Sequence, residues 1–170
     1  MEREIINRVA SSPLITIELD DFYEPGERVE IDLKDNLENE FLLREKDFRQ
    51  FVKDHDWNSY SDKFVAVHCS ADAIIPNWAY MLVASKLSGI SNKIVFGDLN
   101  DLEEKLFLDN ISKLNPDDYL DKKIVIKGCG KIETPPAAFL EITRLLKPFV
   151  SSLMYGEPCS TVPVYKKTKS

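Results

Sequence analysis

The chain has 170 residues, a formal net charge of −7 and 44% apolar residues. This length suits one domain, and the apolar content is sufficient for a sizeable core. The negative charge argues against an electrostatic grip on nucleic acid or on an anionic membrane, because both need clustered Lys and Arg. The sequence therefore predicts a single domain over 1–170 with neither nucleic acid nor membrane as partner.

The N-terminal stretch 1–10 is charged and lacks the apolar region of a secretory signal. Apolar runs elsewhere are far shorter than the ~20 residues of a membrane-spanning helix. We therefore expect a cytoplasmic protein, in which three cysteines are thiols or metal ligands rather than disulfides. No internal repeat is recognisable along the chain.

The N-terminal part, residues 1–60, mixes helix and strand patterns. Apolar spacing and alternation predict helix, strand, strand and helix, in that order, over 2–10, 14–22, 27–35 and 44–56. Pro25 and Gly26 lie between the two strands and predict a turn. The two strands are therefore expected to pair as an antiparallel hairpin.

From residue 61 to 170, short apolar runs alternate with helical patterns. The expected strands are 63–69, 93–98, 122–129 and 151–156, with helices over 76–89, 100–114 and 134–149. Such alternation is typical of a parallel sheet with right-handed crossovers. We predict an α/β fold: a three-layer α/β/α domain with a mostly parallel sheet in the order 2-1-3-4 and the N-terminal hairpin at one edge. Pro163 makes 160–166 at most an edge strand.

Each of the three cysteines follows the carboxyl end of a predicted strand of this sheet. Cys69 follows the first strand, Cys129 the third and Cys159 the fourth. Ligands bind at this edge of open α/β sheets, and neighbouring strands are roughly 4.8 Å apart. Thiolates are preferred ligands of zinc, iron and iron–sulfur clusters. The sequence thus predicts a three-cysteine metal or cluster site at the carboxyl edge.

Residues next to the cysteines complete the predicted site. Asp72 and His68 are candidates for a further metal ligand, although strand alternation aims His68 away from the cysteine that follows it. The fourth position of the metal is otherwise left to water or a partner's group. Gly128 and Gly130 let the backbone turn sharply and approach a cofactor closely, and Glu157 is a loop carboxylate expected at the same place.

Two other functions remain open. The chain has no CxxC pair, no Gly-rich phosphate loop and no dinucleotide fingerprint. A thiol- or persulfide-transfer enzyme would use Cys129 as a nucleophile of low pKa. An acidic protein-interaction module would simply bury its cysteines. A site shared between the chains of a homodimer is also compatible with the sequence.

The blocks CSADAIIPNWAYMLVASKL, KIVFGDL, VIKGCG and MYGEPCSTVPVYK, with the opening MEREIINRVASSPLITIELDDFY, cover much of the chain. They resemble a bacterial family known as domain of unknown function 2480. Genes of that family often lie near those of the SUF-type iron–sulfur assembly system. The resemblance implies a role in iron–sulfur cluster biogenesis with assembly proteins as partners, and its motif cysteines match Cys69, Cys129 and Cys159.

Overall fold

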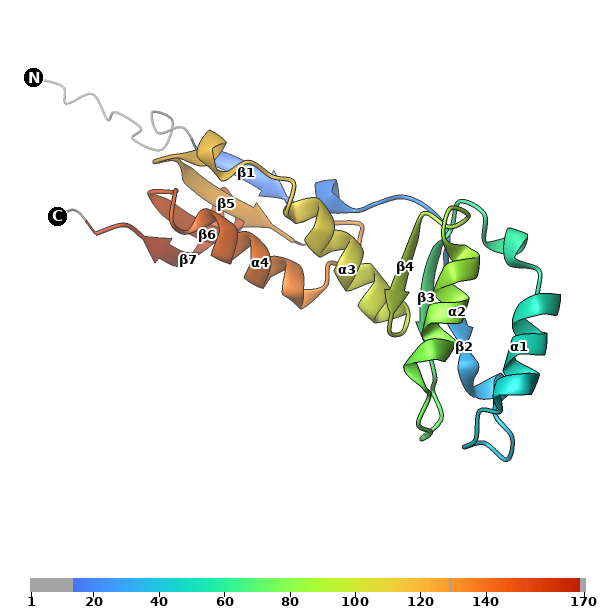
Figure 1. The fold of residues 1–170 in the computed structure, drawn as a ribbon. Helices are drawn as coiled ribbons and strands as arrows, with labels where there is room; N and C mark the ends of the chain where they lie inside the picture. Colours follow the sequence, from blue (N-terminus) through green and yellow to red (C-terminus); the bar gives the residue numbers. More distant parts are fainter. Residues whose placement is uncertain (1–13, 129, 169–170) are drawn as a thin grey trace, which may run out of the picture. The chain divides into compact units, whose positions relative to one another are not determined.

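The computed structural model describes residues 14–128 and 130–168, which form two sheets and four α-helices (Figure 1). The predicted α/β class is confirmed, but the expected single sheet is wrong. The chain divides into two compact units: unit 1 comprises Met1–Glu24 and Leu106–Ser170, and unit 2 comprises Pro25–Lys105. That residues 1–170 behave as one domain stays a prediction.

Unit 2 is a parallel three-stranded sheet in the order β2-β3-β4. Its elements are β2 (Arg28–Asp32), α1 (Glu45–Asp54), β3 (Phe64–His68), α2 (Asn77–Leu87) and β4 (Lys93–Phe96). Val65 and Val67 of β3 pack against Phe48 of α1 and Val83 of α2. Both helices therefore cover the same face of this sheet.

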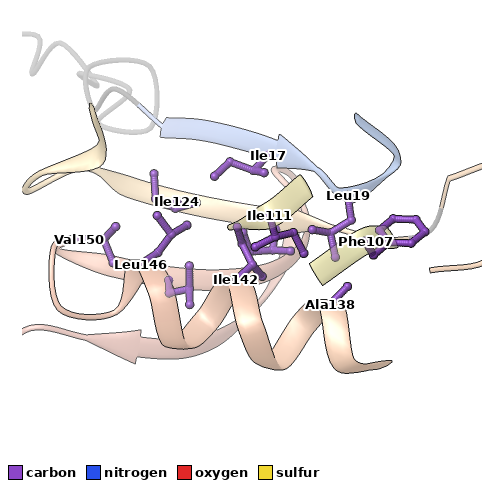
Figure 2. Close-up of a cluster of buried hydrophobic side chains, with 11 residues drawn as sticks. Ile17, Leu19, Phe107, Ile111, Ile124, Ala138, Ile142, Leu146 and Val150 are labelled. Carbon is purple, nitrogen blue, oxygen red and sulfur yellow. The ribbon is translucent and has the colours of Figure 1, made fainter. Parts of the chain in front are cut away.

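Unit 1 is a four-stranded sheet in the order β1-β5-β6-β7, in which the last strand is antiparallel. Its elements are β1 (Leu14–Glu18), the end of α3 (Leu99–Ile111), β5 (Lys123–Lys127), α4 (Pro136–Leu146), β6 (Ser152–Glu157) and β7 (Ser160–Lys166). Figure 2 shows its core, where Phe107 and Ile111 of α3 and Ile142 of α4 gather against Ile17 and Ile124 of the sheet. None of the described helices is both long and apolar enough to cross a membrane.

The predicted N-terminal hairpin is wrong. Ile17 of β1 lies opposite Ile126 of β5, whereas Ile31 of β2 lies opposite Val67 of β3, and both pairings are parallel. The alternation of these strands was identified correctly, but it carries no information on which partner they choose. The antiparallel hairpin lies instead at the C-terminus, where β6 pairs with β7. The predicted helix over 2–10 lies outside the described residues.

The strand order 2-1-3-4 is also wrong, because the four core strands do not share a sheet. β3 and β4 belong to unit 2, whereas β5 and β6 belong to unit 1. The predicted parts 1–60 and 61–170 are interleaved, since each sheet takes its first strand from the former and its next strands from the latter. Apolar strands separated by helices predict parallel pairing, but not where one sheet ends and another begins.

The two units repeat one architecture, which corrects the expectation that the chain has no internal repeat. In each unit a strand is followed by helix, strand, helix and strand, and the parallel strands lie in chain order. Moving 59 residues along the chain takes β3 onto β5, α2 onto α4 and the start of β4 onto the start of β6. The first strands, β1 and β2, are 14 residues apart. Among the described strands, β7 has no counterpart in unit 2.

The repetition extends to the turns that precede the central strands. Asp62 and Asp121 both have left-handed φ angles, 59° and 55°. The amide of Asp62 donates to the carbonyl of Ile90 at 3.1 Å, and the amide of Asp121 donates to the carbonyl of Phe149 at 2.8 Å. Each pair lies 59 residues from its counterpart, so the turn and its tertiary hydrogen bond are repeated together.

An aromatic pair is repeated as well. The rings of Tyr80 and Phe96 are 5.3 Å apart at 83°, and those of Phe139 and Tyr155 are 5.8 Å apart at 74°. In both units the pair joins the first turn of the second helix to the third strand. Edge-to-face contacts of this kind add stability beyond the burial of the rings.

The repeat was missed in the sequence because buried positions exchange one apolar residue for another. Val83 of α2 corresponds to Ile142 of α4, and both are fully buried. Identical residues are few and scattered, such as Gly97 and Gly156, which both have positive φ. What repeats is therefore the burial pattern and the apolar character of the positions, whereas few residues are identical.

Candidate functional site

Cys69 lies just past the end of β3 in unit 2 and is partly buried. It packs against the core of this unit, and its Sγ lies 3.8 Å from the carbonyl oxygen of Ala71. Burial raises the pKa of Tyr80, and the negative charge of a Cys69 thiolate would raise it further. The thiol therefore lies near the phenol of Tyr80, against the aromatic part of the core.

His68 faces the other side of the sheet of unit 2. Its Nε2 atom is buried, makes no hydrogen bond within the described structure, and lies 3.5 Å from the carboxylate of Glu30. Hydrogen bonds from the amides of Asp101 and Asn100 lower the pKa of Asp98, and the charge of a protonated His68 adds to this lowering. The imidazole thus lies among acidic groups, on the face opposite to Cys69.

Asp32, at the end of β2, holds the loop that follows Cys69. Its carboxylate accepts hydrogen bonds from the amide of Ser70 at 3.0 Å, the hydroxyl of Ser70 at 2.5 Å and the amide of Lys34 at 3.0 Å. Burial raises the pKa of Asp32, but these hydrogen bonds outweigh it and hold the pKa far below its usual range. The loop is therefore fixed by an ionised carboxylate.

The predicted metal ligands of unit 2 do not form a metal centre with one another. Asp72 is exposed to solvent. Across residues 14–128 and 130–168, no group of three or more His, Cys, Asp or Glu side chains is arranged to hold a metal ion. Cys129, the remaining cysteine of the predicted site, lies outside the described residues.

The carboxyl edge of unit 1 is held by Lys127 at the end of β5. Its ammonium group lies 3.3 Å from Glu157 at the end of β6 and 3.4 Å from Glu18 at the end of β1. Hydrogen bonds to Glu157 and Glu18 raise the pKa of Lys127. One cation thus links the ends of all three parallel strands.

Gly128 and Gly130 lie in tight packing at this edge. A Cβ atom at Gly128 would lie 2.1 Å from Cζ of Phe139, and one at Gly130 would lie 1.9 Å from Oδ2 of Asp20. The same carboxylate accepts a hydrogen bond from the amide of Lys131 at 2.9 Å. A larger residue at either position would displace a neighbouring side chain, so packing accounts for both glycines without any cofactor.

Cys159 is exposed in the tight turn between β6 and β7. β5 and β6 are adjacent and parallel, so the segments that follow them leave the same edge of the sheet. Cys129 follows β5 in the sequence, whereas Cys69 follows a strand of the other sheet. Cys129 and Cys159 therefore follow neighbouring strands of one sheet, whereas Cys69 does not.

The residues that hold the two edges were missed by sequence reasoning. Asp32, Asp20 and Lys127 each end or follow a strand, and each bonds a loop or strand far away in the chain. A polar residue that ends an alternating strand is a weak sign of such a role, because helix caps and solvated turns show the same pattern.

Unit 1 also contains an apolar cavity of about 360 Å³ beside α4. It is lined by Ile126, Phe139, Thr143, Leu153, Met154, Tyr155 and Val164. None of the predicted site residues lines it, although Phe139, which packs against Gly128, does.

A search of curated proteins and a search of solved structures each found no match. A scan of protein families matched residues 3–167 to the family described as "Protein of unknown function (DUF2480)". The match covers nearly the whole chain and includes the blocks that carry the resemblance in the sequence. The chain therefore belongs to the DUF2480 family.

Proposed function

We propose that this chain binds a soft metal ion or an iron–sulfur cluster at the carboxyl edge of unit 1 and assists iron–sulfur cluster biogenesis. The thiolates of Cys129 and Cys159 are the proposed ligands of this metal ion or cluster. The observation that supports this is the parallel pairing of β5 with β6, which sends the segments after both strands to one edge. The thiolates would meet where the turn after β6 passes the loop after β5.

A cation at this edge would offset part of the charge of a thiolate-ligated cluster. Such a cluster carries net negative charge, and its potential depends on nearby charges and hydrogen bonds. The ammonium group of Lys127 lies at the ends of the strands, where it is paired with Glu157 and Glu18. Two carboxylates lie at this edge beside the loop after β5: Glu157 is held by Lys127, and Asp20 accepts a hydrogen bond from the amide of Lys131. Either carboxylate is a candidate oxygen ligand.

The direct test is the metal content of the full-length protein purified without oxygen. Zinc and iron are measured by mass spectrometry, before and after reconstitution with iron and sulfide. We expect zinc, iron or a cluster with its visible absorption bands. A protein that holds neither metal after both treatments contradicts the proposal.

Single cysteine variants identify the ligands. Cys129→Ser and Cys159→Ser should each lower the bound metal strongly, with far-UV circular dichroism confirming the fold. Cys69→Ser is the matched comparison, because this thiol packs against the core of unit 2. Loss of metal in Cys69→Ser would add a third thiol to the ligand set. Full retention of metal in Cys129→Ser and Cys159→Ser would contradict the site.

A second candidate is sulfur transfer by the same two thiols. The Cys129 thiolate would attack the outer sulfur of a persulfide donor, so that a Cys129 persulfide forms and the donor leaves as a thiolate. The exposure of Cys159 in unit 1 favours this candidate, since an accessible second thiol can receive the sulfur. Mass spectrometry after incubation with a small persulfide should show one added sulfur that Cys129→Ser abolishes.

A further inference from the structure

β4 forms one edge of the sheet of unit 2, and no other strand of the described chain pairs with its outer side. The amide of Gly97 donates inward to the carbonyl of Val67 at 3.1 Å. Because inward and outward residues alternate along a strand, the peptide groups of Ile94 and Phe96 point outward. Phe96 is 73% exposed. Such an edge is a template for another strand.

The repeat indicates what kind of element fits this edge. The strand of unit 1 that corresponds to β4 is β6, and its outer side is covered by the antiparallel strand β7. Leu153 lies opposite Tyr165, and Tyr155 lies opposite Val162. An aliphatic residue thus faces an aromatic one at both positions. Leu153 and Tyr155 correspond to the outward residues of β4.

We propose that β4 of a second copy of this chain occupies this edge, forming a two-fold symmetric dimer. The two β4 strands run antiparallel with Val95 at the centre, so that Phe96 of each copy lies opposite Ile94 of the other. The outward peptide groups of these residues then exchange hydrogen bonds as directly opposed pairs. The unit 2 sheet of one copy then continues into the unit 2 sheet of the other copy.

The sequence of β4 makes a second copy a better occupant than an unrelated strand. A two-fold axis requires a surface that is complementary to itself, and the order Ile94, Val95, Phe96 meets this requirement. Each aliphatic residue faces an aromatic one, as in the pairing of β6 with β7. The ring of Phe96 is already held by Tyr80 at 5.3 Å, so little freedom is lost on association.

The dimer is tested by sedimentation velocity of the full-length protein from low micromolar to several hundred micromolar concentration. A strand of four residues gives a small interface, so we expect a weak dimer that forms as the concentration rises. Phe96→Lys should keep the chain monomeric throughout. Tyr155→Lys is the matched control at the corresponding position of β6, whose edge β7 covers, and should dimerise as the wild type does.

Three results would overturn the proposal: a wild type that stays monomeric at every concentration, a Phe96→Lys variant that still dimerises, or a Tyr155→Lys variant that loses the dimer equally. Circular dichroism checks the fold of each variant. Should Phe96→Lys fail to fold, the crosslinking experiment below decides the matter.

Crosslinking tests the arrangement of the strands. In a chain whose three native cysteines are changed to serine, Val95→Cys would place two sulfurs across the two-fold axis. The opposed Cα atoms of such a pair are about 4.5 Å apart, which is within the range of disulfides. Mild oxidation should give a covalent dimer. Met154→Cys, at the corresponding position of unit 1, should not; absence of crosslinking in Val95→Cys overturns the proposal.

Discussion

Units 1 and 2 build the same order of strands and helices, yet their carboxyl edges carry different chemistry. In unit 2 the central strand ends in His68 and is followed by Cys69 and Ser70. The residues 59 positions further along are Lys127, Gly128 and Cys129. The thiols of the two loops therefore do not correspond. A scaffold set by buried residues has been repeated while the residues at its edge have changed, which is how one fold accommodates different sites.

The contrast between Cys69 and Gly128 explains one of the three cysteines. In unit 2 Cys69 and Tyr80 both pack against the core. In unit 1 the ring of Phe139 fills the corresponding space, and a Cβ at Gly128 would overlap it. Packing alone therefore accounts for Cys69 as a small apolar residue. It does not account for Cys159, which is exposed.

The largest expected loss of stability comes from a substitution that opens a cavity in the core of one unit and leaves the core of the other unit intact. Phe48 and Phe107 occupy corresponding positions in the two cores and are fully buried. Phe48→Ala and Phe107→Ala should each lower the free energy of unfolding by about 3–5 kcal/mol, measured by urea titration. Hydrogen exchange should rise mainly in unit 2 for the first variant and in unit 1 for the second. An equal rise in both units for either variant would mean that the cores unfold together.

The next effect concerns the carboxylate that fixes the loop of unit 2. Asp32→Asn replaces an ionised acceptor of three hydrogen bonds, so the free energy of unfolding should fall by about 2 kcal/mol at pH 7. Because folding lowers the pKa of Asp32, its contribution is present above the usual pKa near 4 and is lost as pH falls. The difference between the two proteins should therefore shrink below about pH 4.

Urea unfolding at a series of pH values measures this difference. Glu18→Gln is the control at the corresponding position of unit 1, where the carboxylate pairs with Lys127 at the surface. Its effect should be smaller than that of Asp32→Asn. A constant difference from pH 7 to pH 3 would show that the ionisation of Asp32 is not what stabilises the loop.

A smaller effect is expected at Gly130, where the units again differ. Gly130→Ala would push the carboxylate of Asp20 away from the amide of Lys131, costing about 1–2 kcal/mol of stability. In unit 2 the corresponding residue is Ala71, and Ala71→Gly should change stability less. In an Asp20→Ala background the cost of Gly130→Ala should largely disappear, as thermal unfolding of the four proteins would show. Persistence of the full cost would rule out Asp20 as its cause.

The smallest effect is expected from the cation at the edge of unit 1. Lys127→Met removes two ion pairs that are partly exposed to water. Exposed pairs contribute little and are screened by salt. The melting temperature should therefore fall only slightly, and the difference from the wild type should vanish in high salt. A large fall that persists in salt would indicate that Lys127 has a buried structural role.

Sequence reasoning located most strands and helices because their local patterns are strong. The run KFVAV is apolar enough to predict a buried strand, and Phe64 to Val67 are all buried. The pairing of the strands could not be predicted in this way. That β1 pairs with β5 rather than with β2 depends on contacts between residues distant in the chain. Sequence order placed Cys159 after β6 and Cys69 after β3. It could not divide the strands between two sheets, so the idea of three neighbouring thiols has no support from pairing.

The pairing of β1 with β5 also bears on how the protein is made. Unit 2 is one continuous segment of the sequence, whereas unit 1 combines the segment before it with the segment after it. During synthesis β1 leaves the ribosome early. Its partner β5 is translated more than a hundred residues later, so β1 stays unpaired until then. Unit 2 can close while β1 is still without its partner, so a chaperone that shields exposed strands has its longest opportunity at the N-terminus.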